Sequence, residues 1–278
     1  MTNPMMSDRG PDGPGQGRAG DSAAWDVRQY LAFGAERTQP AIDLASRVLL
    51  DHPGLVVDLG CGPGNSTDVV RRRWPGARVV GVDHSPEMIA QARAGRPDGH
   101  WVLSDARAFD PGAEVDVLFS NAALQWMADH ERLLGRLFGF LAPGGALAVQ
   151  VPANQHSPFH VALREVAASE RWRRETAGCE RIVHYYGASD YYRWLAPLAR
   201  RVALWETTYY HVLASPDEII AWSRSTALRP YLKRLADDAA RAAFEREVFE
   251  ACRASYPAEP DGRALFPFRR VFFVAYRP

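Results

Sequence analysis

A glycine-rich segment that begins with an acid is the strongest chemical signal in the sequence. It reads Asp58-Leu59-Gly60-Cys61-Gly62-Pro63-Gly64 and overlaps the end of a short apolar run, 55–59. Glycines at such a place let the chain turn tightly and let a ligand touch the backbone. The spacing G-x-G-x-G differs from the G-x-G-x-x-G of dinucleotide sites. A carboxylate here would repel a diphosphate and attract an ammonium group, so the segment predicts a loop for a ligand with a charged amino group.

Two more acids end the next two predicted strands. Asp83 follows the run 78–82, where an acid accepts hydrogen bonds from both hydroxyls of a ribose. Asp105 follows the run 101–103, where an acid either meets an adenine amino group or caps a helix. Because the carboxyl ends of parallel strands line one crevice, both acids predict a nucleoside bound next to the glycine loop.

The segment after the fourth predicted strand carries amide and aromatic side chains. It reads Ser120-Asn121-Ala122-Ala123-Leu124-Gln125-Trp126. We expect Asn121, Gln125 and Trp126 to border and position the reacting group, because this segment also reaches the carboxyl edge of the sheet. It offers no obvious catalytic base, so orientation is the role that its side chains predict.

Alternating strands and helices must position these residues. Short apolar runs predict buried parallel strands, and a helix opens at Ser85-Pro86-Glu87, with Ser85 as cap and Pro86 in the first turn. This rhythm predicts an α/β fold with a doubly wound, mostly parallel seven-stranded sheet. The expected strands are 55–59, 78–82, 101–103, 115–120, 146–151, 201–213 and 271–275. The expected helices in the first half are 40–50, 66–74 and 130–141, together with the helix that opens at Ser85.

The rhythm breaks after Val151, and this predicts insertions. Residues 153–200 and 214–267 look largely helical, so we expect them to form a lid that contributes to substrate binding. Pro143-Gly144-Gly145 predicts a turn before the fifth strand. Residues 1–24, rich in Gly, Pro, Asp and Ser, predict a disordered leader. The domain is expected to run over 25–278, with 25–152 as its cofactor-binding half and a helix from Trp25.

Composition narrows the possible classes of protein. The 278 residues hold 33 basic and 33 acidic side chains, so there is no broad basic field for nucleic acid. Three separated cysteines exclude a disulfide framework, and the sequence has neither a membrane-spanning apolar run nor a secretion signal. We therefore expect a cytoplasmic protein without a membrane partner, with a monomer as the default. His156 and His160 lack the acid of a zinc helix and have Pro158 between them, so no metal is expected.

Taken together, these motifs resemble the class I S-adenosylmethionine methyltransferases, which have a Rossmann-like fold. The resemblance covers about residues 54–152, with the glycine loop, ribose acid, adenine acid and post-strand-four segment in the family's order. It implies S-adenosylmethionine as co-substrate. Met88 is implied to pack on adenine, although core packing of its helix is an equal alternative. The cofactor contacts that it implies are Asp58, Gly60, Gly62, Asn65, Asp83, Met88, Asp105, Ala106 and Asn121.

Longer segments are similar to the trans-aconitate methyltransferases within that class. The resemblance runs from about 25 to 275 and implies methylation of one carboxylate of trans-aconitate, giving a monomethyl ester. Gln39 departs from the family's pattern, in which a second arginine is expected. The similar segments are Trp25 to Tyr30, ERTQPA at 36–41, DLGCGPGNST at 58–67, FSNAALQW at 119–126, AVQVPAN at 148–154, TTYYH at 207–211 and Leu228-Arg229-Pro230.

A polycarboxylate substrate predicts arginine and tyrosine ligands but no general base. The reacting carboxylate is already ionised at neutral pH, so no base is needed. The other carboxylates of the substrate must be held in place, and arginine guanidinium groups and tyrosine hydroxyls are suited to this. Tyr209 and His211 share one strand face and Tyr210 takes the other. Surface ion pairs and aromatic core are the alternative roles of these residues. The chosen substrate residues are Tyr30, Arg37, Tyr209, His211 and Arg229, with Arg269, Arg270, Tyr185, Tyr186 and Tyr210 as further candidates.

Three other functions remain open on the sequence. The acceptor could be the free carboxyl of a malonyl group on an acidic carrier protein, which would need an exposed basic surface near the crevice. The chain could bind S-adenosylmethionine without turnover, in which case a flat open surface is expected beside the methyl group. A nicotinamide-dependent dehydrogenase is disfavoured by the glycine spacing and by Asp58.

Overall fold

The computed structural model describes residues 34–278, with side chains from Thr38 onward. The predicted leader 1–24, the helix expected from Trp25 and the candidate Tyr30 lie outside the described residues. The side chain of Arg37 lies outside them too.

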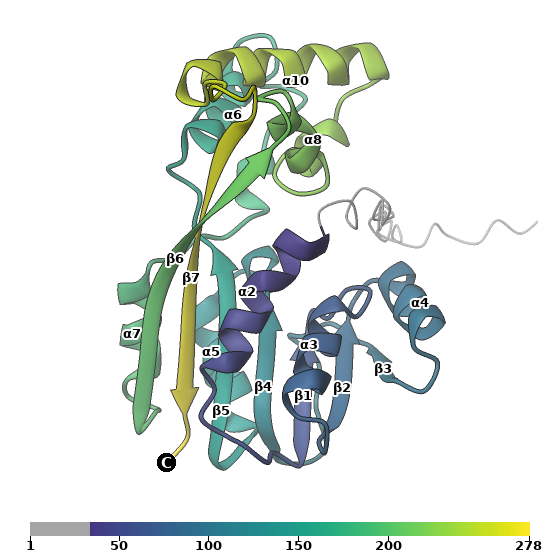
Figure 1. The fold of residues 1–278 in the computed structure, drawn as a ribbon, viewed down its shortest axis with the longest axis vertical. Helices are drawn as coiled ribbons and strands as arrows, with labels where there is room; N and C mark the ends of the chain where they lie inside the picture. The colour runs from purple at the N-terminus through teal and green to yellow at the C-terminus, as the bar shows by residue number, and fades with distance from the viewer. Residues whose placement is uncertain (1–33) are drawn as a thin grey trace, which may run out of the picture.

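Seven strands form one mixed sheet in the order β3-β2-β1-β4-β5-β7-β6 (Figure 1). The pairs β3–β2, β2–β1, β1–β4 and β4–β5 are parallel, and β7 is antiparallel to both β5 and β6. The carboxyl ends of β1, β2, β3 and β4 therefore meet at one edge. The strands are β1 (Leu55–Leu59), β2 (Arg78–Asp83), β3 (His100–Leu103), β4 (Val115–Asn121), β5 (Leu141–Pro152), β6 (Arg201–Leu213) and β7 (Ala264–Tyr276).

Helices cover both faces of this sheet because successive strand side chains point to opposite faces. Val56 and Phe119 pack in one core with α2 (Gly34–Ser46) and α3 (Asn65–Arg73). Val57 and Leu118 pack in the opposite core with α5 (His130–Gly139) and α7 (Ala188–Leu195). Buried on both sides, the strands read as continuous apolar runs, as expected for a doubly wound sheet.

Of two helix starts that the sequence predicted, one is confirmed by the structure and the other is wrong. At α4 (Pro86–Gly95), Ser85 accepts a hydrogen bond from the Met88 backbone N–H at 3.3 Å and Pro86 occupies the first turn, as predicted. Pro40 was expected to open a helix, but it lies inside α2, which extends back to Gly34. A proline inside a helix costs about 3 kcal/mol; burial of α2 residues such as Leu44 against the sheet offsets that cost.

The predicted turn at 143–145 is also wrong as a boundary, because β5 already begins at Leu141. The glycines instead form an irregular stretch within the strand. Gly144 has φ +78°, and the register with β4 shifts between Val115 and Val117. A side chain at Gly145 would lie 2.8 Å from the Ala142 carbonyl oxygen, so the backbones approach closely here.

Strands β6 and β7 continue beyond the carboxyl edge of the sheet into a second layer of helices (Figure 1). We call α6, α8, α9 and α10 the helical unit. Its core joins Phe159, Trp222 and Phe244 to Phe266 of β7. β7 begins at Ala264, so the end of the predicted insertion 214–267 belongs to the strand. The bounds are α6 (Pro158–Ala168), α8 (Glu218–Arg224), α9 (Arg229–Leu232) and α10 (Asp238–Cys252), with short 3-10 helices at η1 (Leu124–Trp126), η2 (Cys179–Arg181) and η3 (Arg253–Ser255).

Candidate active site

The glycine loop after β1 is held against β2 and lines a cavity. Backbone N–H groups of Gly60 and Cys61 donate to the Val82 carbonyl at 2.7 and 3.0 Å. Gly60 has φ +73°, and a side-chain carbon there would lie 2.1 Å from the Ala123 Cβ. Gly62 has φ +54° and faces open space in the cavity. Both glycines are therefore required, one by close packing and one by a ligand-facing backbone.

Asp58 lies behind this loop and lines neither of the two cavities described below. Its Oδ2 accepts hydrogen bonds from Ser66 Oγ at 2.7 Å and Thr67 Oγ1 at 2.6 Å, which fix the start of α3. Oδ1 is buried with no hydrogen-bond partner among the described residues. Burial raises the pKa of Asp58 to about 6, against the opposing effect of the two hydroxyl donors.

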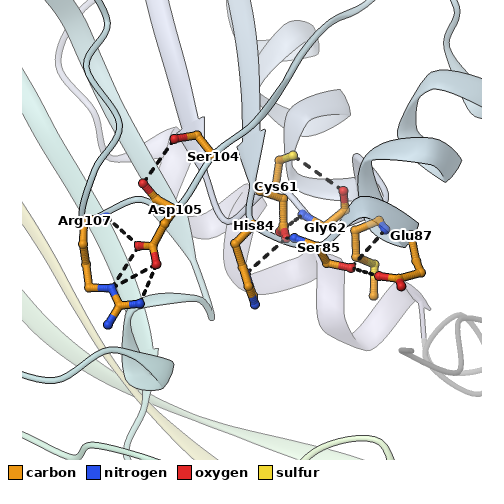
Figure 2. A network of polar contacts seen from close by, with 10 residues as sticks. Cys61, Gly62, His84, Ser85, Glu87, Ser104, Asp105 and Arg107 are labelled. Carbon is orange, nitrogen blue, oxygen red and sulfur yellow. Dashed lines mark hydrogen bonds and ion pairs between the residues drawn. The ribbon is translucent and has the colours of Figure 1, made fainter. Parts of the chain in front are cut away.

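Asp83 connects the end of β2 to the glycine loop. Its Oδ2 accepts from the Gly62 N–H and its Oδ1 from the Ser85 N–H, both at 2.9 Å. The His84 ring lies 3.5 Å from Oδ1, beside the loop drawn in Figure 2. Burial acts to raise the pKa of Asp83, but these donors outweigh it and hold the pKa below its ordinary value. Asp83 is therefore an ionised carboxylate on the cavity wall.

A smaller neighbouring cavity contains the predicted adenine acid. Asp105 and Ala106 line it together with Arg107, and it shares Asp83 and Trp126 with the larger cavity. Arg107 forks onto Asp105, with Nε 2.9 Å from Oδ1 and Nη2 2.5 Å from Oδ2 (Figure 2). These hydrogen bonds lower the pKa of Asp105. The sequence predicted the acid but not the arginine beside it.

The segment after β4 faces the larger cavity, at the carboxyl edge of the sheet where it was expected. Asn121, Gln125 and Trp126 line it, and Ala122 between them has φ +54°. Gln125 donates to the Ala122 carbonyl at 2.7 Å. The Asn121 and Gln125 side-chain oxygens are buried without partners among the described residues. Asn65 and Met88 also line this cavity, and Met88 is not among the residues around Asp105.

The larger cavity extends from the glycine loop to the helical unit. Its far wall is formed by side chains that the sequence alone did not bring together. They come from the end of β5, from α6, from the segment before α7, from α8 and the turn that follows it, and from β7. These residues are Pro152, His160, Val183, Tyr185, Trp222, Ser223, Thr226, Ala227, Phe268 and Arg270.

Among the candidate arginines, Arg270 is the one that lines this cavity within the described side chains. Its side chain is buried, at 4% exposure, and Nη1 donates to Gln150 Oε1 at 3.2 Å. Arg269 points the other way and forms an exposed ion pair with Glu206 at 2.7 Å. Arg229, which the sequence analysis chose as a substrate residue, begins α9 and lines neither cavity. Because side chains alternate along a strand, Arg269 and Arg270 point to opposite faces of β7. The sequence does not say which of the two faces the cavity, and the register in the structure shows that it is Arg270.

The predicted tyrosine and histidine ligands of β6 do not reach the cavity. The face prediction is confirmed, because His211 is buried and Tyr210 is 64% exposed. However, Tyr209 donates to Asp43, and the His211 ring stacks on Trp222 at 4.2 Å. Tyr186 packs against His130. The reason is packing: these rings fill gaps between layers, whereas Tyr185 lines the cavity.

His160 is a cavity residue that sequence reasoning missed as a ligand. In the sequence His160 stands out only through its spacing from His156, and this spacing indicates a metal pair rather than a substrate ligand. Ser157 Oγ lies 2.8 Å from its Nδ1. Within residues 34–278, no cluster of three or more His, Cys, Asp or Glu side chains is arranged to hold a metal ion. The described helices include none with the length and apolarity needed to cross a membrane.

Fold and site define the class of protein to which this chain belongs. A family model described as a methyltransferase domain matches residues 56–145, from β1 to β5. A phosphoethanolamine N-methyltransferase from Haemonchus contortus, solved with S-adenosyl-L-methionine, superposes with a TM-score of 0.57 at 16% identity, over 91% of this chain and 56% of that one. The chain therefore contains a methyltransferase domain with the fold of S-adenosylmethionine-binding enzymes.

Curated relatives identify the family within that class. A trans-aconitate 2-methyltransferase from Azoarcus sp. (strain BH72) is 48% identical over 256 residues, covering 91% of this chain and 99% of the relative. One from Yersinia pseudotuberculosis is 43% identical over 254 residues, covering 91% of this chain and 98% of the relative. The chain belongs to the trans-aconitate 2-methyltransferase family.

Proposed function

We propose that the protein transfers a methyl group from S-adenosylmethionine to one carboxylate of trans-aconitate, giving the monomethyl ester and S-adenosylhomocysteine. The observation that carries this proposal is the buried guanidinium of Arg270 in the same cavity as the glycine loop. A guanidinium removed from water has a strong preference for a carboxylate partner. The relatives from Azoarcus and Yersinia carry the name of this activity.

We assign S-adenosylmethionine to the end of the cavity nearest β1 and β2. The open space before Gly62 lets the methionine part lie against the loop, with the negative charge of Asp58 behind it. Asp83 is assigned to the ribose hydroxyls; a carboxylate has acceptor capacity beyond its bonds to Gly62 and Ser85. Adenine is assigned to the smaller cavity at Asp105 and Ala106. Gly60, Asn65, Met88 and Asn121 complete the proposed contacts.

We assign the carboxylic acid to the other end, below the helical unit. Arg270 binds one carboxylate that does not react, and Gln150 holds the guanidinium in place. Asn121, Gln125 and Trp126 line the same cavity, and we assign to them the orientation of the reacting carboxylate toward the methyl group. We infer that insertions 153–200 and 214–267 act as the substrate-binding lid of a single domain over 25–278.

The chemistry that this arrangement needs is orientation and exclusion of water. The bound sulfonium supplies an electrophilic methyl group, and a carboxylate of pKa about 4 is already ionised at neutral pH. The residues therefore need not remove a proton or hold a metal. Aromatic side chains such as Trp126 and Phe268 limit water at the nucleophilic oxygen, which strengthens its attraction to the sulfonium.

A panel of acids with labelled S-adenosylmethionine tests this function. It contains trans-aconitate, citrate, isopropylmalate and a malonyl-carrier protein, with products identified by mass spectrometry and one arm containing EDTA. We expect base-labile methyl incorporation into trans-aconitate, unchanged by EDTA. A buried arginine inside the cavity favours a free acid over a carrier, and favours turnover over simple binding. Absence of methylation of every polycarboxylate would overturn the proposal.

A further inference from the structure

The wall of the cavity opposite the sheet contains two neutral polar side chains. His160 lies in the first turn of α6 and is 8% exposed, and Tyr185 lies in the segment between η2 and α7. Their ring centroids are 6.4 Å apart with planes at 87°. Both line the cavity that contains Arg270. The helical unit, through His160, and the segment before α7, through Tyr185, thus contribute hydrogen-bonding groups to a site whose buried cation comes from the sheet.

The polar atoms of this wall are available for a ligand. Ser157 Oγ engages Nδ1 of His160, which leaves Nε2 without a hydrogen-bond partner among the described residues. The Tyr185 hydroxyl likewise has no partner in the described part of the chain. Because both residues line the cavity, a ligand bound there can reach these two polar atoms and supply their hydrogen-bond partner.

The charges around His160 keep its ring neutral before a ligand binds. Burial, assisted by the positive charge of Arg164 one turn further along α6, lowers the pKa of His160 to about 4. From the other elements packed against the ring, Tyr185 faces it directly and Tyr256 acts through Ser157. Burial raises the pKa of Tyr185 to about 12, so it is also neutral. An incoming carboxylate would supply the missing negative charge and favour the imidazolium.

The proposed substrate has one carboxylate more than the groups assigned so far. One carboxylate reacts, and Arg270 binds a second, so the third needs a partner. We propose that His160 and Tyr185 form a subsite for this third carboxylate, and that the His160 imidazole takes up one proton from solvent when the carboxylate binds. In the complex, Nδ1–H donates to Ser157 and Nε2–H donates to the carboxylate. This inference rests on the proposed function.

Selectivity among acids follows from this subsite. A substrate that lacks the third carboxylate gains nothing from His160. The subsite therefore distinguishes a tricarboxylate from dicarboxylates such as itaconate and glutaconate, each of which lacks one carboxylate of trans-aconitate. It also makes binding of the tricarboxylate dependent on pH, because the proton must be supplied from solvent.

Isothermal titration of trans-aconitate into the S-adenosylhomocysteine complex tests the proton uptake. Experiments at pH 7 in two buffers of different ionisation enthalpy give the number of protons bound. We expect about one proton for the wild type and none for His160→Gln. His156→Asn is the matched control, because this exposed histidine lies just before α6; it should retain the uptake.

Kinetics with three acids test the subsite itself. His160→Gln should raise KM for trans-aconitate roughly 10- to 100-fold, the range for a hydrogen bond to a charged group. Tyr185→Phe, which removes only a hydroxyl, should raise it about 5- to 10-fold. Itaconate and glutaconate each lack a different carboxylate of trans-aconitate. For the acid that lacks the carboxylate bound by the subsite, KM should be the same in His160→Gln and in the wild type. Affinity for S-adenosylhomocysteine should stay at the wild-type value in both variants, which also reports correct folding.

The two possible failures are distinguishable. If wild-type protein methylates trans-aconitate while both variants match it and no proton is taken up, the subsite is wrong and the function stands. If the wild type neither binds nor methylates trans-aconitate, the proposed function fails and the subsite with it.

Discussion

The guanidinium of Arg270 donates from Nη1 to Gln150 Oε1 at 3.2 Å, between the neighbouring strands β7 and β5. Gln150 is fully buried and Arg270 is 4% exposed. The Phe268 ring lies 4.7 Å from the guanidinium carbon. The guanidinium therefore places a buried positive charge on the wall of the cavity, which favours a ligand that brings negative charge.

Substitution of Arg270 should damage substrate binding and leave cofactor binding intact. We expect Arg270→Gln to lower kcat/KM for trans-aconitate by roughly 100- to 1000-fold, because a buried charge pair is lost. Affinity for S-adenosylhomocysteine, measured by titration calorimetry, should change little. Arg269→Gln is the matched control, since it removes only an exposed ion pair with Glu206. Equal kinetics of the two variants would exclude Arg270 as a ligand.

This pair of arginines illustrates what the sequence could predict about the substrate end. Alternation on a strand predicts that one of two neighbours points inward, but the choice depends on the twist and register of β7 against β5. Arg229 lies in a segment that is similar to the family, Leu228-Arg229-Pro230, but such similarity carries no information on side-chain direction. His160 and Tyr185 are brought to the cavity by packing between layers, which depends on contacts distant in sequence.

The cofactor end was much more predictable. The glycine loop and the segment after β4 meet because parallel strands end at one edge, and that follows from the order of elements. Asp58 is the exception. Its position in the motif suggested a direct contact, but the strand ends with this side chain directed behind the loop, toward Ser66 and Thr67.

The Gly62–Asp83 hydrogen bond predicts a strong effect at the ribose acid. Asp83→Asn should weaken binding of S-adenosylhomocysteine roughly 10- to 100-fold, because both the loop contact and the proposed ribose contact lose an ionised acceptor. Asp68→Asn is the control, since Asp68 forms a partly exposed ion pair with Arg96 on the outer side of α3. Calorimetry measures both variants. Wild-type affinity for Asp83→Asn would contradict the assignment.

Close packing of the glycine loop predicts a large effect of a single methyl group. Gly60→Ala places a carbon 2.1 Å from the Ala123 Cβ at φ +73°. The loop must shift to make room for this carbon. We expect the free energy of unfolding to fall by roughly 2 kcal/mol and the binding of S-adenosylhomocysteine to be lost. Gly76→Ala, where the added carbon meets nothing within 4 Å, should be neutral in thermal melting and calorimetry. A neutral Gly60→Ala would show that the loop does not need this approach.

The buried carboxylate of Asp58 predicts opposite effects on stability and on binding. Its pKa is raised to about 6 from 3.8, so between these values the folded state binds more protons than the unfolded state. Stability of the protein without ligand therefore falls as pH rises through this window. Asp58→Asn removes that loss, and should raise the free energy of unfolding at pH 7 by roughly 1–2 kcal/mol after allowing for weaker hydrogen bonds.

Binding should respond in the other direction. The ionised Asp58 attracts the ammonium group of the ligand, so affinity for S-adenosylhomocysteine should increase as pH rises from 5 to 7 in the wild type. Asp58→Asn should bind about tenfold more weakly at pH 7 and show a flatter pH profile. Denaturant unfolding and calorimetry provide the two readouts. A destabilised Asp58→Asn with an unchanged pH profile would refute this role.

Co-crystals with S-adenosylhomocysteine and trans-aconitate test most directly whether both ligands share the cavity between the glycine loop and the helical unit. The account predicts the homocysteine part at Gly60 and Gly62, a carboxylate paired with Arg270, and the reacting carboxylate facing the sulfur near Asn121. Trans-aconitate bound elsewhere, with Arg270 in contact with protein groups only, would contradict it.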